Sequence, residues 1–393
     1  MKKLLKKFRK PLIGFILTVL FAAIVIGAAA VVLNDNKNVS TNDVLSSIEY
    51  ASIYLAQSVK SDGSFIYEYD PVRDVEEDGY NILRHAGTIY SMFEIYEAFP
   101  RQDIRISGER AIEYMNAQMR SCNRNQALCL EEDREVKLGG NALAMLALIQ
   151  YSEATNTRDH DDTIHKLATW ITSVQDEDGQ FTIHKASYPS MRRENFVSTY
   201  YPGEAIYALA RACQLLETES YCADAESAAN WIITVRDDGL GINELPHDHW
   251  FLYGLRELYT VTNNELYATQ SYNIANTIIN NQITNDPENP HWVGGFYEPP
   301  RSAPTATRME GLIAAYETGN LSYEYKQDLQ KTIKRGVALL TELQITPNIL
   351  AQNQISFADQ GLGGFVRGFG EQDIRIDYVQ HAVSALLGYH RHF

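Results

Sequence analysis

One pattern recurs six times from residue 41 onward, and it limits the folds open to this chain more than any other feature. In each repeat, a helical stretch with one apolar stripe is followed by a glycine-rich segment. A second helical stretch then begins with polar residues and is apolar on nearly all sides after its first turn. Repeats of this length are typical of stacked helix pairs, and six pairs fill residues 41–393 without room for another domain.

The hydrophobic period places both members of each pair. The expected first members span residues 43–60, 104–120, 161–174, 221–235, 265–282 and 322–343. The expected second members span residues 80–98, 140–153, 202–217, 247–260, 305–317 and 377–389. Because a helix that is apolar all round must be buried, we predict an all-α fold, an (α/α)6 toroid with the second members as its inner ring. An open solenoid is the alternative, although neither end carries the polar face of a capping repeat.

Glycine-rich segments, most of them with an aromatic residue, precede inner helices. They are 62–65, 178–181, 238–241, 294–297 and 363–365. Glycine permits a tight turn there, and the aromatic ring can fill the seam between neighbouring pairs. We expect short β-hairpins at the mouth of the toroid.

The N-terminal segment differs in character from the repeats. Residues 1–11 are basic, and residues 12–33 form a 22-residue run with no charge and Thr18 as its one polar side chain. At about 1.5 Å per residue, such a run reaches about 33 Å and can cross a bilayer. We predict a cytoplasmic segment at 1–11, a single-pass signal anchor at 12–33 in the inner (cytoplasmic) membrane, a tether at 34–42, and the toroid, 43–393, in the periplasm or outside the cell. A signal peptide cleaved near residues 28–30 is the alternative.

The charge of the chain excludes one class of partner. Six of the 34 basic side chains lie in the first ten residues, so the remainder has 28 basic against 50 acidic groups and a net charge of −22. A body this acidic repels phosphate backbones, so we expect no nucleic-acid partner. An acidic ligand would need a local basic pocket.

The four cysteines form two local pairs. Cys122 and Cys129 bracket a short loop, and Cys213 and Cys222 bracket a turn between two expected helices. In a chain expected to be exported, this spacing favours two disulfides over a metal site, which would use closer Cys-x-x-Cys or Cys/His spacing.

Polar side chains concentrate at the starts of the inner helices. They are Arg84, His85, Asn141, Tyr200, Tyr201, Glu204, His247, Asp248, His249, Arg308, Glu310, Asp377, Tyr378 and His381. In a toroid these helix starts meet around one mouth, so we predict a single cavity there. Helix N-termini carry unpaired N–H groups and Arg84 and Arg308 add charge, which favours an acidic or hydroxyl-rich glycan. Aromatic residues such as Tyr297 offer flat faces to sugar rings.

Two kinds of chemistry remain open. A pair of carboxyl groups at the mouth could hydrolyse a glycosidic bond as acid and base. Alternatively, a tyrosine and a histidine could remove and return the C5 proton of a uronic acid while an arginine neutralises its carboxylate. The predicted catalytic residues are Glu204, Asp248, His249, Glu310 and Tyr378. The predicted substrate-binding residues are Arg84, His85, Asn141, Tyr200, Tyr201, Tyr297, Arg308, Asp377 and His381.

No cofactor and no metal are predicted. His247 and His249 form a His-x-His pair with no evident third ligand. The acidic run 159–162 resembles a motif of class II terpene cyclases, but it falls at the start of an outer helix, away from the mouth. A polar cavity also does not suit a polyprene.

Three segments resemble the C-terminal helical domain of D-glucuronyl C5-epimerases. One is Phe296-Tyr297-Glu298, followed by Pro304 and Glu310-Gly311-Leu312, which is similar to that family's run into an inner helix. The others are Gly203-Glu204-Ala205-Ile206 and Arg375-Ile376-Asp377-Tyr378, which look like its Gly-Gln-Ala-Ile helix and its Arg-Trp-Asp-Tyr motif. The resemblance implies a glycan-binding toroid within the broader six-hairpin glycosidase architecture.

The chain also departs from that family. Pro299 and Pro300 stand where the family has its catalytic Glu-Tyr pair, Phe365 stands near its second catalytic tyrosine, and Tyr378 alone matches a catalytic position. We therefore predict an exported, membrane-anchored, carbohydrate-active protein that acts on an acidic polysaccharide or cell-surface glycan by epimerisation, hydrolysis or elimination. A non-catalytic glycan-binding or assembly factor of a polysaccharide synthesis or export system is the alternative.

Overall fold

The computed structural model describes residues 39–122, 126–347 and 358–393, which hold twelve α-helices and nine short strands. The outer helices are α2 (Thr41–Ser58), α4 (Gln102–Ala117), α6 (Asp161–Ser173), α8 (Glu219–Trp231), α10 (Glu265–Asn280) and α12 (Tyr323–Glu342). The inner helices are α3 (Ile82–Ala98), α5 (Leu138–Thr155), α7 (Tyr201–Leu216), α9 (His249–Thr262), α11 (Ser302–Glu317) and α14 (Ile376–His392). All twelve predicted helices are present, with ends that differ from the prediction by a few residues.

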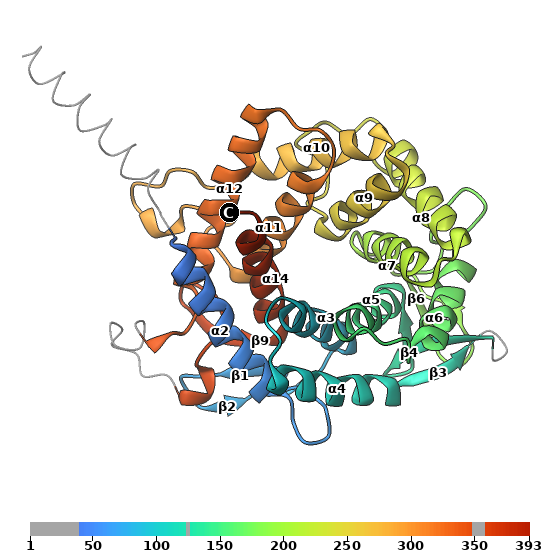
Figure 1. Cartoon of the computed structure of the whole chain (residues 1–393), viewed down its shortest axis with the longest axis horizontal. Helices are drawn as coiled ribbons and strands as arrows, with labels where there is room; N and C mark the ends of the chain where they lie inside the picture. Colours follow the sequence, from blue (N-terminus) through green and yellow to red (C-terminus); the bar gives the residue numbers. More distant parts are fainter. Residues whose placement is uncertain (1–38, 123–125, 348–357) are drawn as a thin grey trace, which may run out of the picture.

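The helices form two concentric rings (Figure 1). Each inner helix packs against the inner helices before and after it, and α14 packs against α3, which closes the inner ring. The outer ring closes where α2 meets α12, beside α14. The predicted (α/α)6 toroid is therefore confirmed, and the open solenoid is excluded because the last pair contacts the first.

Burial follows the two hydrophobic patterns seen in the sequence. In the inner helix α5 every residue from Leu138 to Ser152 is buried. In the outer helix α6 the buried residues are spaced three or four apart, as Ile164, Leu167, Ala168 and Ile171 illustrate. Fully burying one large aliphatic side chain contributes about 1.5–3 kcal/mol, so this difference in pattern decides which helix of each pair lies inside.

Two small antiparallel sheets stand before the inner helices. One has the order β2 (Val75–Glu76), β1 (Glu68–Asp70), β9 (Glu371–Arg375), β8 (Val366–Gly368). The other has the order β3 (Met119–Cys122), β4 (Ala127–Glu132), β5 (Glu135–Lys137), β6 (Lys185–Ser187), β7 (Arg192–Arg193). Strand β9 leads directly into α14 and β5 into α5, so the sheets lie where short hairpins were predicted.

Two glycines show why the glycine-rich segments recur. Gly63, after α2, has φ +88°, and a Cβ there would lie 2.2 Å from the carbonyl oxygen of Arg110 on α4. Gly363, after α12, has φ +90°, and a Cβ there would lie 2.1 Å from the carbonyl oxygen of Tyr50 on α2. A residue without a side chain is therefore needed where one pair meets the next, including the place where the ring closes.

Both predicted disulfides are present. Cys122–Cys129 links β3 to β4, and Cys213–Cys222 links the end of α7 to the start of α8. Their Cα atoms are 6.0 Å and 5.4 Å apart, respectively.

The predicted cytoplasmic segment at 1–11 and signal anchor at 12–33 lie outside the described residues. Within residues 39–122, 126–347 and 358–393, no helix combines the length and the apolar character needed to cross a bilayer.

Helix α2 begins two residues earlier than the predicted toroid boundary because Ser40 caps it. The Ser40 hydroxyl accepts a hydrogen bond from the Asp43 N–H, and the Asp43 carboxylate accepts one from the Ser40 N–H.

Candidate active site

The first turns of the six inner helices surround one cavity of about 360 Å³, called the mouth cavity below. The predicted site residues that line it are Arg84, Tyr200, Tyr201, Glu204, His249, Tyr297, Arg308, Asp377 and His381. They come from α3, α7, α9, α11 and α14 and from the segment before α11, and Leu143 adds a contact from α5. Closure of the ring thus brings together side chains that are far apart in the sequence.

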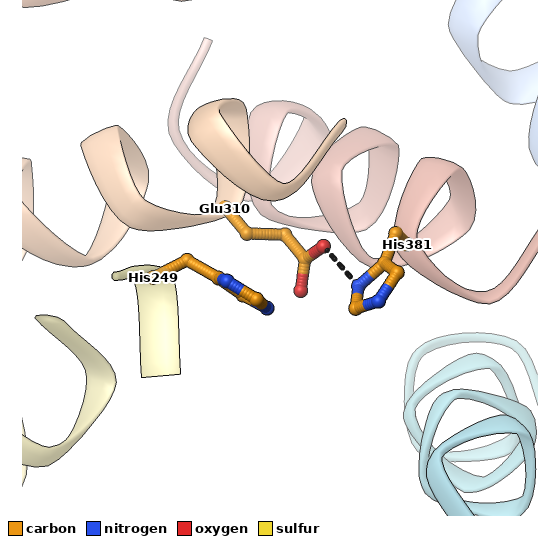
Figure 2. A group of neighbouring side chains, drawn as sticks. All are labelled: His249, Glu310 and His381. Atoms are coloured by element: carbon orange, nitrogen blue, oxygen red, sulfur yellow. Dashed lines mark hydrogen bonds and ion pairs between the residues drawn. The ribbon is translucent and has the colours of Figure 1, made fainter. Parts of the chain in front are cut away.

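Three side chains from three inner helices meet at the floor of the mouth cavity: His249 of α9, Glu310 of α11 and His381 of α14 (Figure 2). His381 Nδ1 donates a hydrogen bond to Glu310 Oε1 over 2.8 Å. The His249 ring lies edge-on to the His381 ring, with 5.2 Å between ring centroids. Neither ring nitrogen of His249 has a hydrogen-bond partner among the described residues, although both are buried. The floor is thus a carboxylate–histidine dyad beside a free imidazole.

Burial and charge push the pKa values of the two histidines apart. Burial holds the pKa of His249 well below its ordinary value, and the positive charges of His381 and Arg308 lower it further. Burial also acts to lower the pKa of His381, but the carboxylate of Glu310 outweighs burial and raises that pKa. These shifts favour the neutral form of His249 and the protonated form of His381.

The same three residues are also the candidates for holding a metal. Each offers one ligand atom, and these atoms lie within 4.8 Å of one another. In this arrangement His381 Nδ1 and Glu310 Oε1 are hydrogen-bonded to each other. His247, the other half of the His-x-His pair, accepts a hydrogen bond at Nδ1 from Arg308 Nε over 2.9 Å and does not join the group.

Arg308 brings a positive charge to the mouth cavity with no carboxylate beside it. It donates to three neutral acceptors, His247 Nδ1, the Pro304 carbonyl oxygen at 2.8 Å and the Tyr297 hydroxyl at 3.1 Å. No ion pair to Arg308 exists within the described part of the chain, and three of its five N–H groups are used. A mostly buried guanidinium in this state favours an anionic group on a ligand.

The positive charge of Arg84, unlike that of Arg308, is compensated by a carboxylate of the protein. Arg84 Nε donates to Asp377 Oδ2 over 3.1 Å, and Arg84 Nη1 donates to the Tyr67 hydroxyl over 2.7 Å. Arg375 also holds Asp377, with 2.6 Å between Nε and Oδ1. Burial acts to raise the pKa of Asp377, but these two arginines outweigh it and lower the pKa. Asp377 is therefore an ionised carboxylate on the wall of the mouth cavity.

The pKa of the Glu204 carboxyl group is shifted in the opposite direction to that of Asp377. Glu204 lines the mouth cavity, is 4% exposed, and its Oε2 has no hydrogen-bond partner within the described ranges. Burial raises the pKa of Glu204 well above its ordinary value, and the neighbouring Asp248 raises it further.

Five of the predicted site residues lie outside the lining of the mouth cavity. His85 is fully buried, with Nδ1 accepting from the Tyr80 hydroxyl at 2.7 Å and Nε2 donating to the Ala111 carbonyl oxygen at 2.8 Å. Asn141 accepts from the Leu130 N–H at 2.9 Å and donates to the Lys137 carbonyl oxygen at 2.8 Å. Their hydrogen bonds join the starts of α3 and α5 to neighbouring segments.

The other three residues outside the lining are predicted catalytic residues. Asp248 caps α9 by accepting from the Phe251 N–H at 3.1 Å. The Tyr378 hydroxyl accepts from Arg367 Nε at 2.9 Å. Glu310 is not among the residues that line the mouth cavity; its carboxylate lies between His249 and His381 and accepts a hydrogen bond from His381. A helix has several faces, and these side chains leave it on faces that do not line the cavity.

Three polar lining residues were not among the predicted site residues: Asn81, Thr307 and Gln380. Each lies within three positions of a residue that was predicted, namely Arg84, Arg308 and Asp377, so inspection of the neighbouring positions on these helices could have found them. Trp250 lies beneath the cavity beside His249, with 4.7 Å between ring centroids. Tyr200 and Tyr297, by contrast, stand at the rim and are about half exposed.

No family model and no curated protein matches the chain in sequence. Solved structures match it over almost their whole length. Cellobiose 2-epimerase from Bacillus thermoamylovorans is 12% identical with a TM-score of 0.70, covering 90% of this chain and 99% of that one. An inactive variant of an α-1,6-mannanase from Salegentibacter, in complex with α-1,6-mannotriose, is 10% identical with a TM-score of 0.62, covering 88% and 98%. An unsaturated glucuronyl hydrolase specific for heparin is 12% identical with a TM-score of 0.58, covering 89% and 97%.

The likeness is one of fold. This chain shares the (α/α)6 toroid fold of these structures. At identities of 10–12%, their activities do not transfer with the fold. The finer resemblance to the C-terminal domain of D-glucuronyl C5-epimerases stays a prediction.

Proposed function

We propose that this protein is a carbohydrate-active enzyme that removes the C5 proton of a uronate residue in an acidic glycan, as a uronate epimerase does. One observation carries the proposal. Two histidines with oppositely shifted pKa values lie under the same cavity as Arg308, whose charge has no carboxylate partner within the described residues. The occurrence of this fold in a sugar epimerase and in a glucuronyl hydrolase is consistent with it.

In the proposed reaction, Arg308 binds the carboxylate of the sugar. His249 takes the proton from C5, and the electron pair of the C–H bond moves into the carboxylate to give an enediolate. The positive charge of Arg308 stabilises the negative charge that develops there. His381 then gives its proton back to C5, which restores the C–H bond, and Glu310 stabilises the protonated form of His381 before the transfer. Exchange with solvent returns both histidines to their starting states.

The test is incubation of the purified protein in D2O with oligosaccharides that contain glucuronate, with cellobiose and α-1,6-mannotriose as neutral controls. NMR and mass spectrometry should find deuterium at C5 of the uronate with no change in chain length. His249→Gln should abolish this exchange. If an unsaturated sugar appears at a new chain end, the reaction is elimination and not epimerisation. Binding of the oligosaccharide without deuterium uptake would overturn the proposal. The remaining interpretation would then be a non-catalytic glycan-binding or assembly factor.

Hydrolysis is the second candidate, and one observation favours it. Glu204 and Asp377 both line the mouth cavity, and their pKa values are shifted in opposite directions. Such a pair could supply the protonated acid and the ionised carboxylate of a glycosidase. New reducing ends without deuterium at C5 would identify this reaction, and Glu204→Gln would then abolish it.

We also propose that the toroid is exported and stays attached to the inner membrane through residues 12–33, where it meets a glycan during synthesis or export. The basic segment before an apolar run supports this orientation. Two disulfides suit an oxidising compartment.

A further inference from the structure

Glu204 has an unusual environment for a carboxylate. It lies in the first turn of α7, lines the mouth cavity and is nearly fully buried. No cation lies within ion-pair distance of it in the described part of the chain, and its Oε2 has no hydrogen-bond donor there. A buried ionised carboxylate without a cation or donors is expensive by several kcal/mol, so this group is stable only when it carries a proton.

The position of Glu204 is built into the neighbouring helices. Gly139, on α5, leaves space for the carboxyl group, because a Cβ there would lie 2.0 Å from Glu204 Oε2. Gly203 leaves space for Asp248 in the same way, because a Cβ there would lie 2.9 Å from Asp248 Oδ2. The absence of a side chain at these two glycines thus leaves room for both carboxyl groups between the inner helices.

Burial raises the pKa of Glu204, and the neighbouring Asp248 adds to this effect. Asp248 is fully buried at the start of α9, its Oδ2 has no partner among the described residues, and burial raises its own pKa to about 7. Two neighbouring carboxyls cannot both ionise at low cost. Tyr201, on the same helix as Glu204, is the other titratable group beside it, while Arg84 of α3 is engaged by Asp377. Arg236, the cation nearest to Asp248, pairs with Asp237.

We propose that Glu204 is a neutral carboxylic acid that donates a hydrogen bond to an oxygen of the sugar bound in the mouth cavity. A neutral donor suits an anionic ligand better than a charged one, because a second ionised carboxylate in the cavity that Asp377 also lines would add to the repulsion. The inference deepens the proposed function, on which its sugar ligand rests, and it gives Glu204 a role different from the proton donor of a hydrolase.

The first test needs no substrate. Infrared spectra at pH 7 should contain the carbonyl stretch of a protonated carboxylic acid that is present in the wild type and absent from Glu204→Gln. In Asp248→Asn, which keeps a good helix cap, the titration of this band should move to lower pH because the like charge is gone. Absence of a difference band at pH 7 would overturn the proposal.

The second test measures binding of a glucuronate-containing oligosaccharide by calorimetry. The amide of Glu204→Gln can still donate, so its affinity should stay within about threefold of the wild type, whereas Glu204→Ala should lose on the order of tenfold. Equal loss in both variants would overturn the proposal and favour the hydrolase. If the wild type binds but takes up no deuterium, the proposed reaction fails, while retained binding in Glu204→Gln still supports the neutral donor.

Discussion

The hydroxyl of Tyr253 donates a hydrogen bond to Oε2 of Glu310 over 3.2 Å, while Oε1 of the same carboxylate accepts from His381. Tyr253 also lines a second cavity, of about 490 Å³, formed by the later turns of the inner helices. Glu310 is therefore fixed from both sides: the dyad partner holds it from the mouth cavity, and a residue of the second cavity holds it from behind. Glu310 contributes more than Asp377, the other carboxylate that raises the pKa of His381.

Glu310→Gln should lower the pKa of His381, because the carboxylate is what raises it against the effect of burial. The acid would then lose its proton near neutral pH, and deuterium exchange at C5 should fall on the order of a hundredfold, as expected for loss of a general acid. NMR titration of the histidine ring protons measures the pKa directly. Tyr253→Phe is the matched control, since it removes one hydrogen bond and keeps the charge. An unchanged His381 midpoint in Glu310→Gln would contradict the dyad.

Arg308→Met should weaken binding of a uronate oligosaccharide by roughly 10- to 100-fold, the range for loss of charged hydrogen bonds of about 1.5–3 kcal/mol. Its melting temperature should stay within a few degrees of the wild type, because no ion pair to Arg308 is broken within the described residues. Arg84→Met is the contrasting variant and should destabilise the fold, because Asp377 loses one of its cations. If Arg308→Met binds the uronate oligosaccharide as tightly as the wild type does, Arg308 does not bind the carboxylate of the sugar. The same conclusion follows if the wild type binds uronate and neutral sugars equally.

The buried His85 should make stability depend on pH. Burial lowers the pKa of His85 from 6.5 to about 4 in the folded state, so the unfolded chain binds the proton more readily between these values. Stability is therefore present above pH 6.5 and is lost as the pH falls toward 4, by up to about 3 kcal/mol from this residue. Urea unfolding at pH 7 and pH 5 should show a smaller loss in His85→Gln than in the wild type. Replacement of the exposed His165 is the matched control. An equal loss of unfolding free energy between pH 7 and pH 5 in all three proteins would show that His85 is not responsible.

A reporter enzyme that is active only after export should be active when fused to Phe393, because the basic segment before residues 12–33 favours a cytoplasmic N-terminus. The fusion should sediment with membranes. Deletion of residues 1–33 should abolish both results. A soluble mature form that begins near residue 31 would show that residues 12–33 belong to a cleaved signal peptide and not to an anchor. Reporter activity only in the cytoplasm would contradict export.

The sequence by itself determined the helices, their assignment to the inner or outer ring and the disulfide pairs. These depend on neighbouring residues: a helix such as α5 is apolar on every face within its own length, and Cys213 reaches Cys222 across one turn. The convergence of the helix starts also followed, because the pair repeats six times and each inner helix must begin at the same end of the ring.

Only the tertiary structure decided which side chains of a first turn enter the cavity. Asp248 and His249 are adjacent in sequence, yet one caps α9 and the other lies at the floor. Likewise, His381 meets Glu310 across 71 positions, and no local spacing could pair them. The rotation of each helix about its axis is set by packing against both neighbours, and the last of these contacts, α14 against α3, exists only once the ring has closed.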